Sequence, residues 1–370
     1  MIRVTYIISS IDRSLAFEWI VNKIDKKKIS LSFILLNTGD SELEKFLKSS
    51  GIPVYRTKYT GKKDTVNALL AIRKILKTED PHIVHTHLFE ASVIGLSAAR
   101  TLGIKRRIYT RHHSTYHHSY HPQAVKYDRL CNFLSTDIVA ISKNVENVLA
   151  EKEKVIRKKI HLIHHGFDLA AFGSVSPDDQ SAMVKKYNPR NASPVIGVIA
   201  RQTEWKGIQF IIPAFRKLLN EYPQALLLLA NAGGNYREKI KEMLSTIPQR
   251  NYLEIPFERD IISLYSVFDL FVHVPIDPHC EAFGQTYIEA LAAGIPSVFT
   301  LSGVAPEFIE HEKNALVVPF CDSDAVYKAL YSLLNDAQLQ ARLSTRGKMD
   351  VVKYFYLDKM IRSLEALYVS

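Results

Sequence analysis

Short apolar runs alternate with helical stretches along the whole chain, and this alternation constrains the fold more than any other feature. The runs are rich in Val, Ile and Leu and lack strict apolar–polar alternation, as expected for parallel strands that are covered on both faces. Strand-like runs occupy residues 2–9, 31–37, 83–87, 107–111, 137–141, 159–164, 195–200, 225–231, 252–255, 270–274, 297–301 and 315–318. Helical stretches between them include residues 64–76, 90–102, 207–221 and 323–334. This spacing predicts βαβ units in open, doubly wound parallel α/β sheets.

The strands are too numerous for one ordinary sheet and indicate two domains. Residues 172–194 are rich in Gly, Pro, Ser and Asp, which is typical of a linker. We therefore expect an N-terminal Rossmann-like domain at 1–171 and a C-terminal one at 172–351 that includes the linker, the two facing across a cleft. Ligands of such sheets bind beyond the carboxyl ends of the strands.

Composition excludes several classes of protein. The 370 residues are 47% hydrophobic and 23% charged, which is unlike collagen or a disordered chain. The three cysteines lie far apart, so neither a disulfide framework nor a zinc cluster is expected. No apolar run reaches the roughly 18–20 residues of a membrane span, and the N-terminus reads as a strand instead of a signal peptide. We expect a cytoplasmic chain.

Positive charge is concentrated in the first half. Residues 1–170 hold 28 Lys and Arg against 16 Asp and Glu, whereas the remaining residues are slightly acidic. The basic clusters lie at 26–28, 105–107 and 152–159. They fit a solvated face, or an anionic membrane or acceptor surface. Nucleic acid is the weakest alternative, because no nucleic-acid-binding motif accompanies the charge.

Two turns in the second half suit a nucleotide sugar. Arg201 and Lys206 follow an apolar strand and precede a helix, where the two cations could grip a phosphate. Residues 284–293 predict a short helix that starts at a glycine, and its N-terminus also suits a phosphate. Glu281 precedes this helix and Glu289 lies within it, so both carboxylates could accept hydrogen bonds from sugar hydroxyls.

The spacing of these residues resembles that of a known family. The segments R-x4-K-G after a strand and E-x-F-G-x4-E-A-x-A-x-G-x-P resemble the retaining family-4 glycosyltransferases of the GT-B fold. Residues 159–168 resemble the family's pre-linker segment, and residues 352–370 its closing helix, which crosses back to the first domain. The resemblance implies a hexosyltransferase in which Arg201 and Lys206 bind the donor diphosphate. It also implies that Glu289 binds the ribose, and that Glu281 and the Phe283-Gly284 backbone hold the hexose.

Histidines crowd the first domain. In the family a histidine in the loop after the corresponding strand approaches the donor sugar, and His112 is the candidate for this catalytic role, with His113 as the alternative. We expect His117, His118 and His121 to be solvated loop residues. His85 and His87 form an H-x-H pair, but no acidic cluster accompanies them, so a metal site is not expected.

The leading hypothesis is a metal-independent, retaining transferase without a bound cofactor. Its donor would be a UDP- or GDP-sugar, and its acceptor a saccharide, a lipid-linked saccharide or a small polyol in surface glycan synthesis. Asp322 and Asp324 flank Ser323 at the start of a helix, where capping explains them better than a metal ion does. The basic first domain would allow peripheral contact with the inner face of an anionic membrane.

Two alternatives stay open. One is a nucleotide-sugar epimerase or hydrolase of the same fold. The other is a non-catalytic nucleotide-sugar-binding protein, which is suggested by the segment 9–14, where the family often has a Gly-Gly loop.

Overall fold

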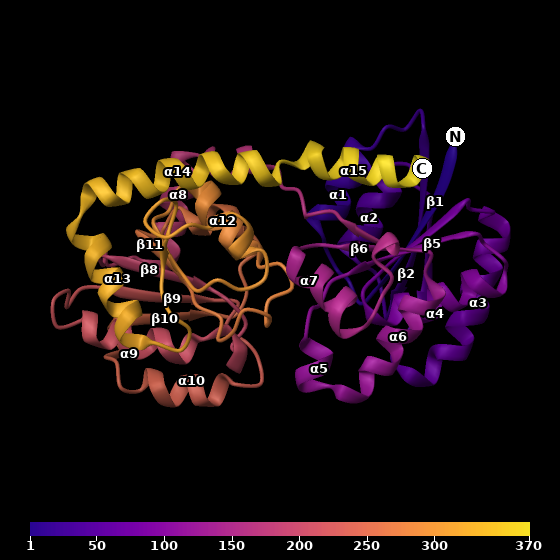
Figure 1. The fold of residues 1–370 in the computed structure, drawn as a ribbon. Helices are drawn as coiled ribbons and strands as arrows, with labels where there is room; N and C mark the ends of the chain where they lie inside the picture. The colour runs from indigo at the N-terminus through magenta and orange to yellow at the C-terminus, as the bar shows by residue number, and fades with distance from the viewer. The chain divides into compact units, whose positions relative to one another are not determined.

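The computed structural model describes residues 1–370, which divide into two compact units. The first unit comprises Met1–Phe167 and Leu357–Ser370, and the second comprises Asp168–Tyr356. Each unit contains one parallel sheet that is covered by helices (Figure 1). None of the helices combines the length and the apolar character needed to span a bilayer.

The sheet of the first unit has seven parallel strands in the order β3-β2-β1-β4-β5-β6-β7. The strands are β1 (Ile2–Ser9), β2 (Ile29–Asn37), β3 (Val54–Lys58), β4 (Ile83–His87), β5 (Arg106–Arg111), β6 (Asp137–Ala140) and β7 (Ile160–Leu162). The sequence predicted six of these strands and missed β3. This strand lies at the edge of the sheet, and its exposed Arg56 and Lys58 interrupt the apolar pattern.

Successive residues of β1 point into different cores. Tyr6 and Ile8 pack with α1 (Leu15–Lys23) and α15 (Leu357–Val369) on one face of the sheet. Ile7 points to the other face, where α3 (Thr65–Glu79), α4 (Phe89–Thr101) and α6 (Val125–Leu134) pack in a row. Figure 1 shows these two helix layers on either side of the sheet. Burial on both faces explains why the central strands read as continuous apolar runs.

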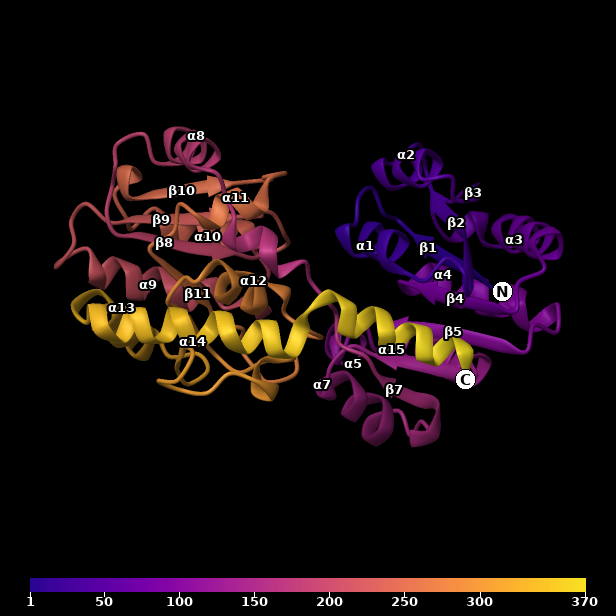
Figure 2. The same ribbon diagram turned by 90° about the horizontal axis from the view of Figure 1, so that it is seen from above.

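The sheet of the second unit has six parallel strands in the order β10-β9-β8-β11-β12-β13, and the first four can be followed in Figure 2. All six were predicted: β8 (Val195–Ile199), β9 (Leu226–Ala230), β10 (Tyr252–Ile255), β11 (Leu270–His273), β12 (Ser297–Phe299) and β13 (Leu316–Val317). Helix α9 (Ile208–Leu218) packs beside α13 (Ser323–Asn335), and α12 (Gln285–Ala293) packs beside α14 (Ala337–Phe355).

The predicted linker is partly helical. Helix α8 (Pro177–Tyr187) begins where the Ser176 side chain accepts a hydrogen bond from the Asp179 backbone N–H at 3.1 Å. A capping serine, a proline in the first turn and acidic residues after it are signals for a helix start. The prediction of an irregular linker was wrong for this segment, because the same Ser, Pro and Asp residues were taken as signals that interrupt regular structure.

The closing helix begins later than the predicted residue 352. Helix α14 continues to Phe355, whose buried ring lies 5.8 Å from the ring of Phe283 and 4.8 Å from that of Phe308 in the second unit. The backbone is extended at Tyr356, and the Leu357 N–H then donates to the Phe167 carbonyl at 3.1 Å in the first unit. The change of unit therefore occurs at residue 356.

Candidate functional site

The loops after β8 and β11 lie against each other at the carboxyl edge of the second sheet. These strands are neighbours, and Gly207 has φ +75°. A side chain at this position would place its Cβ 1.8 Å from the Val274 carbonyl oxygen, so only glycine permits the close approach. The approach brings Lys206, at the end of one loop, toward the residues of the other.

Lys206 and Glu281, which the sequence predicted separately, form an ion pair. The Lys206 Nζ lies 2.5 Å from the Glu281 Oε1, and the His273 Nε2 lies 3.1 Å from the same oxygen. His273 is the last residue of β11 and is buried. His273 was not predicted as a site residue, because a histidine at the end of an apolar strand belongs to no recognisable motif.

The Glu281 carboxylate is ionised although it is buried. Burial would raise its pKa, but the charge of Lys206 and the hydrogen bond with His273 outweigh burial and hold the pKa well below its ordinary value. Burial lowers the pKa of His273, so this ring is neutral at neutral pH. The site therefore holds one cation and one anion in contact, with a neutral donor behind the anion.

The loop before α12 is tied to the loop after β12. The Glu281 N–H donates to the Ser302 Oγ at 3.1 Å, and the Phe283 carbonyl accepts from the Val304 N–H at 2.9 Å. Gly303, with φ +64°, leaves space for both Glu281 and Phe283. The predicted hexose-binding segment is therefore anchored by residues 302–304, which the sequence analysis did not single out.

Helix α12 begins at Gln285, directly after Gly284 and one residue later than predicted. Gly284 has φ +91°, and a Cβ there would lie 2.5 Å from the ring of Tyr287. Gly294 ends the helix with φ +76°. A helix start without a capping side chain leaves backbone N–H groups available to an anion.

Arg201 is exposed at the end of β8 and takes part in no ion pair. Its neighbour Gln202 is buried and donates from Nε2 to the Glu254 Oε1 at 2.7 Å. Glu254 belongs to β10. The exposed guanidinium can therefore meet an anionic ligand without first losing a partner.

Glu289 lies within α12 and is bonded to a residue of α11 (Ile261–Tyr265). Its Oε2 accepts a hydrogen bond from the Tyr265 hydroxyl at 2.9 Å. Burial raises the pKa of Glu289 to about 7, and the hydrogen bond from Tyr265 opposes this shift in part. The carboxyl group is half-buried and titrates near neutral pH. We define Arg201, Lys206, His273, Glu281 and Glu289 as the candidate donor site.

In the first unit, His112 follows β5 and lies between two other histidines. A hydrogen bond of 3.1 Å joins its Nε2 to the Nδ1 of His87, and its ring stacks on that of His165 at 5.6 Å. Burial and the neighbouring histidines hold the pKa of His112 well below its ordinary value. His112 is therefore neutral, with Nε2 engaged by the protein.

His85 is a core histidine and not part of a metal site. Its Nδ1 lies 2.7 Å from the Tyr368 hydroxyl of α15, and its Nε2 lies 2.9 Å from the Thr110 Oγ1. Burial lowers the pKa of His85 to about 3. Both ring nitrogens are occupied, and His87 stacks on the ring of Tyr6.

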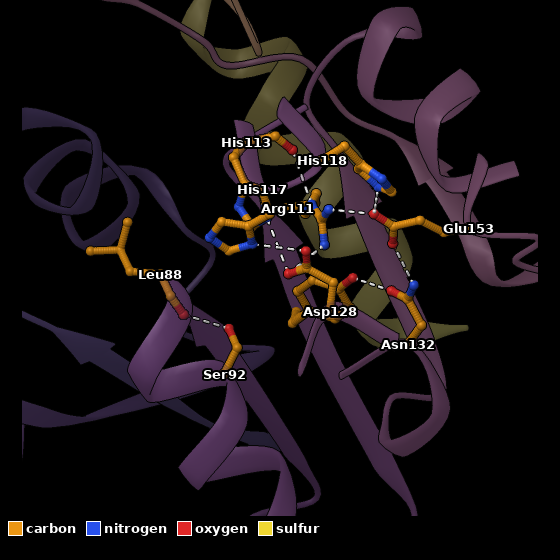
Figure 3. A network of polar contacts seen from close by, with 10 residues as sticks. Leu88, Ser92, Arg111, His113, His117, His118, Asp128, Asn132 and Glu153 are labelled. Atoms are coloured by element: carbon orange, nitrogen blue, oxygen red, sulfur yellow. Dashed lines mark hydrogen bonds and ion pairs between the residues drawn. The ribbon is translucent and has the colours of Figure 1, made fainter. Parts of the chain in front are cut away.

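The alternative candidate, His113, belongs to a buried polar network around Asp128 (Figure 3). The His113 Nε2 and the Arg111 Nη1 each lie 3.1 Å from the Asp128 Oδ1, and the His117 Nδ1 lies 2.8 Å from the Oδ2. Burial and the charge of Arg111 lower the pKa of His113 to about 4. His113, His117 and Asp128 are close enough together to hold a metal ion, but Arg111 already supplies positive charge to the same carboxylate.

The contacts of Glu153 extend this network, and the prediction that His117 and His118 are solvated is wrong. Arg111 and His118 contact the Glu153 Oε1 at 2.6 and 3.1 Å. His117 is buried and His118 is half-buried, whereas we expected both to be solvated. Only His121 is exposed as expected. Their acidic partners lie 11 and 35 residues downstream, on other elements, so the sequence of the loop itself does not reveal the pairing. We define Arg111, His113, His117, His118, Asp128 and Glu153 as the histidine network.

Asp322, one of the two acidic residues at the start of α13, caps the helix, as predicted. The Asp322 side chain accepts from the Ala325 N–H at 2.9 Å. Asp324 is not the cap; it pairs with Lys217 at 3.1 Å on the surface. Each carboxylate thus has an ordinary structural role.

Two families match nearly the whole chain. The family described as Glycosyltransferase Family 4 matches residues 22–171, and the family described as Glycosyl transferases group 1 matches residues 179–350. The chain is 25% identical to a capsular polysaccharide biosynthesis glycosyltransferase, CapM, of Staphylococcus aureus, over 82% of this chain and 80% of the relative. It is 24% identical to an alpha-monoglucosyldiacylglycerol synthase of Acholeplasma laidlawii, over 81% of this chain and 77% of the relative.

A solved structure has the same fold over its full length. The crystal structure of Anabaena Alr3699/HepE in complex with UDP-glucose aligns with a TM-score of 0.84 at 18% identity and covers 100% of both chains. Together with the two family matches and the strand-end site of the second unit, this likeness confirms the predicted fold class. The chain belongs to the family-4 glycosyltransferases, enzymes of the GT-B fold that transfer sugars from nucleotide donors.

Proposed function

We propose that this enzyme transfers a hexose from a uridine or guanosine diphosphate sugar, bound on the second unit, to a saccharide, lipid-linked or small polyol acceptor. The observation that carries the proposal is the Lys206–Glu281 ion pair beside the exposed Arg201 and the glycine start of α12. This arrangement offers positive charge and backbone N–H groups for a diphosphate, and an ionised carboxylate for sugar hydroxyls.

The pair divides the donor chemistry between its two members. Lys206 has three N–H donors, of which one meets Glu281, so the others can bind phosphate oxygens. Negative charge grows on the departing phosphate as the glycosidic bond breaks, and fixed cations stabilise it without reorganisation. Glu281 would accept hydrogen bonds from the hexose, together with the Phe283-Gly284 backbone.

Glu289 and His112 receive the remaining roles. The half-buried Glu289 carboxylate would accept hydrogen bonds from the ribose hydroxyls, with Tyr265 holding one of its oxygens. His112 would meet the donor sugar through its Nδ1, because its Nε2 is bonded to His87. His113 is bound within the histidine network, which favours His112 over it.

The acceptor would be handled by the basic first unit. Two of the matched relatives are named for the synthesis of a capsular polysaccharide and of a glucosyldiacylglycerol, and the net positive charge of residues 1–170 suits an anionic surface. We therefore include a peripheral contact between the first unit and an anionic membrane in the proposed function.

Nucleotide-sugar binding is the first test. Calorimetric titration with UDP-glucose and GDP-mannose should identify one donor, and Arg201→Ala should weaken its binding. A donor at 100 times its dissociation constant adds about 2.7 kcal/mol to the free energy of unfolding, so a thermal shift is a second readout. Binding of no nucleotide sugar by the wild-type chain would contradict the proposal.

Turnover separates transfer from the alternatives. Release of nucleoside diphosphate should require an acceptor and should persist in excess chelator, because the cations at the site belong to the protein. Rapid turnover without an acceptor would instead indicate an epimerase or hydrolase. Loss of turnover in chelator with rescue by Mg²⁺ or Mn²⁺ would contradict the metal-independent mechanism.

A further inference from the structure

Helix α6 of the first unit carries an unusual set of exposed apolar side chains. Its inner side buries Asp128, Cys131 and Leu134, and its outer side exposes 38% of Tyr127, 38% of Leu130 and 76% of Phe133. These three residues recur at intervals of three along a helix of 10 residues and so share one face. A large exposed apolar surface of this kind marks an interaction site.

A fourth exposed apolar residue lies on a segment that contacts α6. Asn132 of α6 donates to the Glu153 Oε2 at 2.7 Å, and the Lys159 Nζ donates to the Asn132 carbonyl at 2.5 Å. These contacts hold the segment 153–159 against the end of α6. Ile156, in the middle of the segment, is 62% exposed. We define Tyr127, Leu130, Phe133 and Ile156 as the α6 patch.

Basic side chains neighbour the residues of the α6 patch in the sequence. The exposed ones on the helix and on the neighbouring segment are Lys126, Arg129, Lys152, Lys154, Arg157 and Lys158. The exposed acidic residue among them is Glu151, which lies 4.0 Å from Arg157. This charge opposes the packing of two copies through the same face, since like charges would meet, and it complements an anionic partner.

The geometry points to anionic phospholipid as that partner: α6 lies in the plane of the membrane interface, with Phe133 and Ile156 inserted among the headgroups. This inference deepens the membrane contact within the proposed function and gives it a place in the chain. A helix of 10 residues rises about 15 Å, half the hydrocarbon thickness of a bilayer, so α6 can lie on a membrane but not cross it.

The apolar and basic residues act on different parts of the interaction. Apolar side chains gain free energy by leaving water, and Lys and Arg are attracted to anionic headgroups within a Debye length. Binding should therefore need both anionic lipid and Phe133, and it should weaken as salt rises. A purely electrostatic surface would not depend on Phe133.

The test uses flotation of the full chain with phosphatidylcholine vesicles, with and without phosphatidylglycerol. Phe133→Ser should lower the partition coefficient on anionic vesicles by about tenfold, because one aromatic side chain no longer leaves water. Phe257→Ser is the matched control, since Phe257 is 77% exposed but belongs to the second unit. Arg129→Glu should also reduce binding, whereas Lys27→Glu, in another basic cluster, should not.

A spectroscopic variant makes the test independent of binding yield. Phe133→Trp should show a blue-shifted emission with anionic vesicles, and Phe257→Trp should not. Equal binding to neutral vesicles, or equal binding by Phe133→Ser and the wild type, would overturn the inference. Absence of vesicle binding together with self-association through Phe133 would also overturn it and would indicate a protein partner.

The nucleotide titration distinguishes this failure from failure of the proposed function. A chain that binds its donor but ignores vesicles loses only the α6 patch as a membrane site. A chain that binds vesicles but no nucleotide sugar keeps the α6 patch and loses the proposed transferase activity.

Discussion

The candidate donor site and the histidine network both gather ionisable groups around strand ends, but they arrange their charges differently. In the donor site, Arg201 is exposed, Lys206 keeps 20% of its side chain in water, and Glu289 has a pKa of about 7. In the histidine network, Arg111 and its two acidic partners expose no more than 2% of their side chains. The charged groups of the donor site can therefore exchange a protein partner for a ligand, whereas those of the histidine network cannot.

This contrast indicates a structural role for the histidine network and a binding role for the candidate donor site. A buried ion pair whose hydrogen bonds are satisfied fixes the positions of the elements that carry it. A partly exposed cation beside an anion is instead available to an incoming diphosphate. The first unit is rich in histidines, but their number does not indicate a binding site. The exposure of a histidine is the better indicator of whether it can meet a ligand.

The largest expected effect comes from removing the donor-site cation. Lys206→Ala should lower kcat/KM by about 10²–10³-fold, the loss typical of one stabilising group at a developing charge. Lys217→Ala, which removes a surface lysine paired with Asp324, serves as the control and should leave turnover unchanged. Steady-state kinetics check both variants, and an equal effect of the two would contradict the role of Lys206.

Combining this variant with Arg201→Ala adds a finer test. The two effects should be less than additive if both cations bind the same diphosphate. Full additivity would show that the two side chains act independently.

Breaking the histidine network should cost stability and leave donor binding intact. Asp128→Asn leaves the buried Arg111 with one anionic partner, and removing a partner from a buried ion pair costs about 3 kcal/mol. Chemical denaturation should detect this loss. Asp137→Asn, which affects the more exposed pair with His161, should cost much less, and equal losses would contradict the comparison.

Acid should weaken the first unit before it affects the Lys206–Glu281 pair. Burial lowers the pKa of His85 to about 3 and that of His113 to about 4, both below the ordinary value of about 6.5. Between these values the unfolded chain binds protons that the folded chain excludes, so the free energy of unfolding falls as pH falls from about 6.5 toward 4. Thermal unfolding across this range checks the trend; His85→Phe should reduce the pH dependence.

Glu289 should show the opposite pH dependence. Its folded pKa of about 7 lies above the ordinary value of 4.5, so the folded chain binds the extra proton and stability falls as pH rises from 4.5 to 7. Glu289→Gln should therefore stabilise the chain at pH 8 and have little effect at pH 4.5. The reverse order in thermal shifts would contradict a raised pKa.

The smallest effects are expected away from both sites. Asp322→Ala removes the cap of α13 and should cost about 1 kcal/mol of stability. Asp324→Ala removes only an exposed ion pair and should change stability by less. Neither variant should alter turnover, and a large loss of activity in either would revive a metal role for this acidic pair.

Much of the fold followed from sequence because burial on both faces leaves a strong local signal. The continuous apolar runs predicted all strands of the second sheet, and Gly284 and Gly294 marked α12. The edge strand β3 was missed because only Thr57 of its five residues is buried and the exposed Arg56 and Lys58 interrupt the apolar pattern. Arg201, Lys206, Glu281 and Glu289 were singled out because they belong to two short motifs that follow β8 and β11.

Pairings between distant segments could not be predicted. Glu281 meets Lys206 only because Gly207 allows one loop to approach the end of β11. Asp128 and Glu153 fix the histidines of a segment that reads, by itself, as a polar loop. Such contacts depend on tertiary structure. The hydrophobic periodicity of one segment does not show which distant residue it will contact.

The return of the chain at Tyr356 has a consequence for synthesis on the ribosome. Helix α15 completes a wall of the first unit, and its Tyr368 hydroxyl lies 2.5 Å from that of Tyr6 and 2.7 Å from the His85 ring. During synthesis, one apolar face of residues 1–167 therefore stays uncovered until the entire second unit and α15 have left the ribosome. The second unit is continuous in sequence and can fold first. A nascent chain of this kind has an interval in which chaperones would be expected to bind its N-terminal half, and loss of the last few residues would prolong that interval indefinitely.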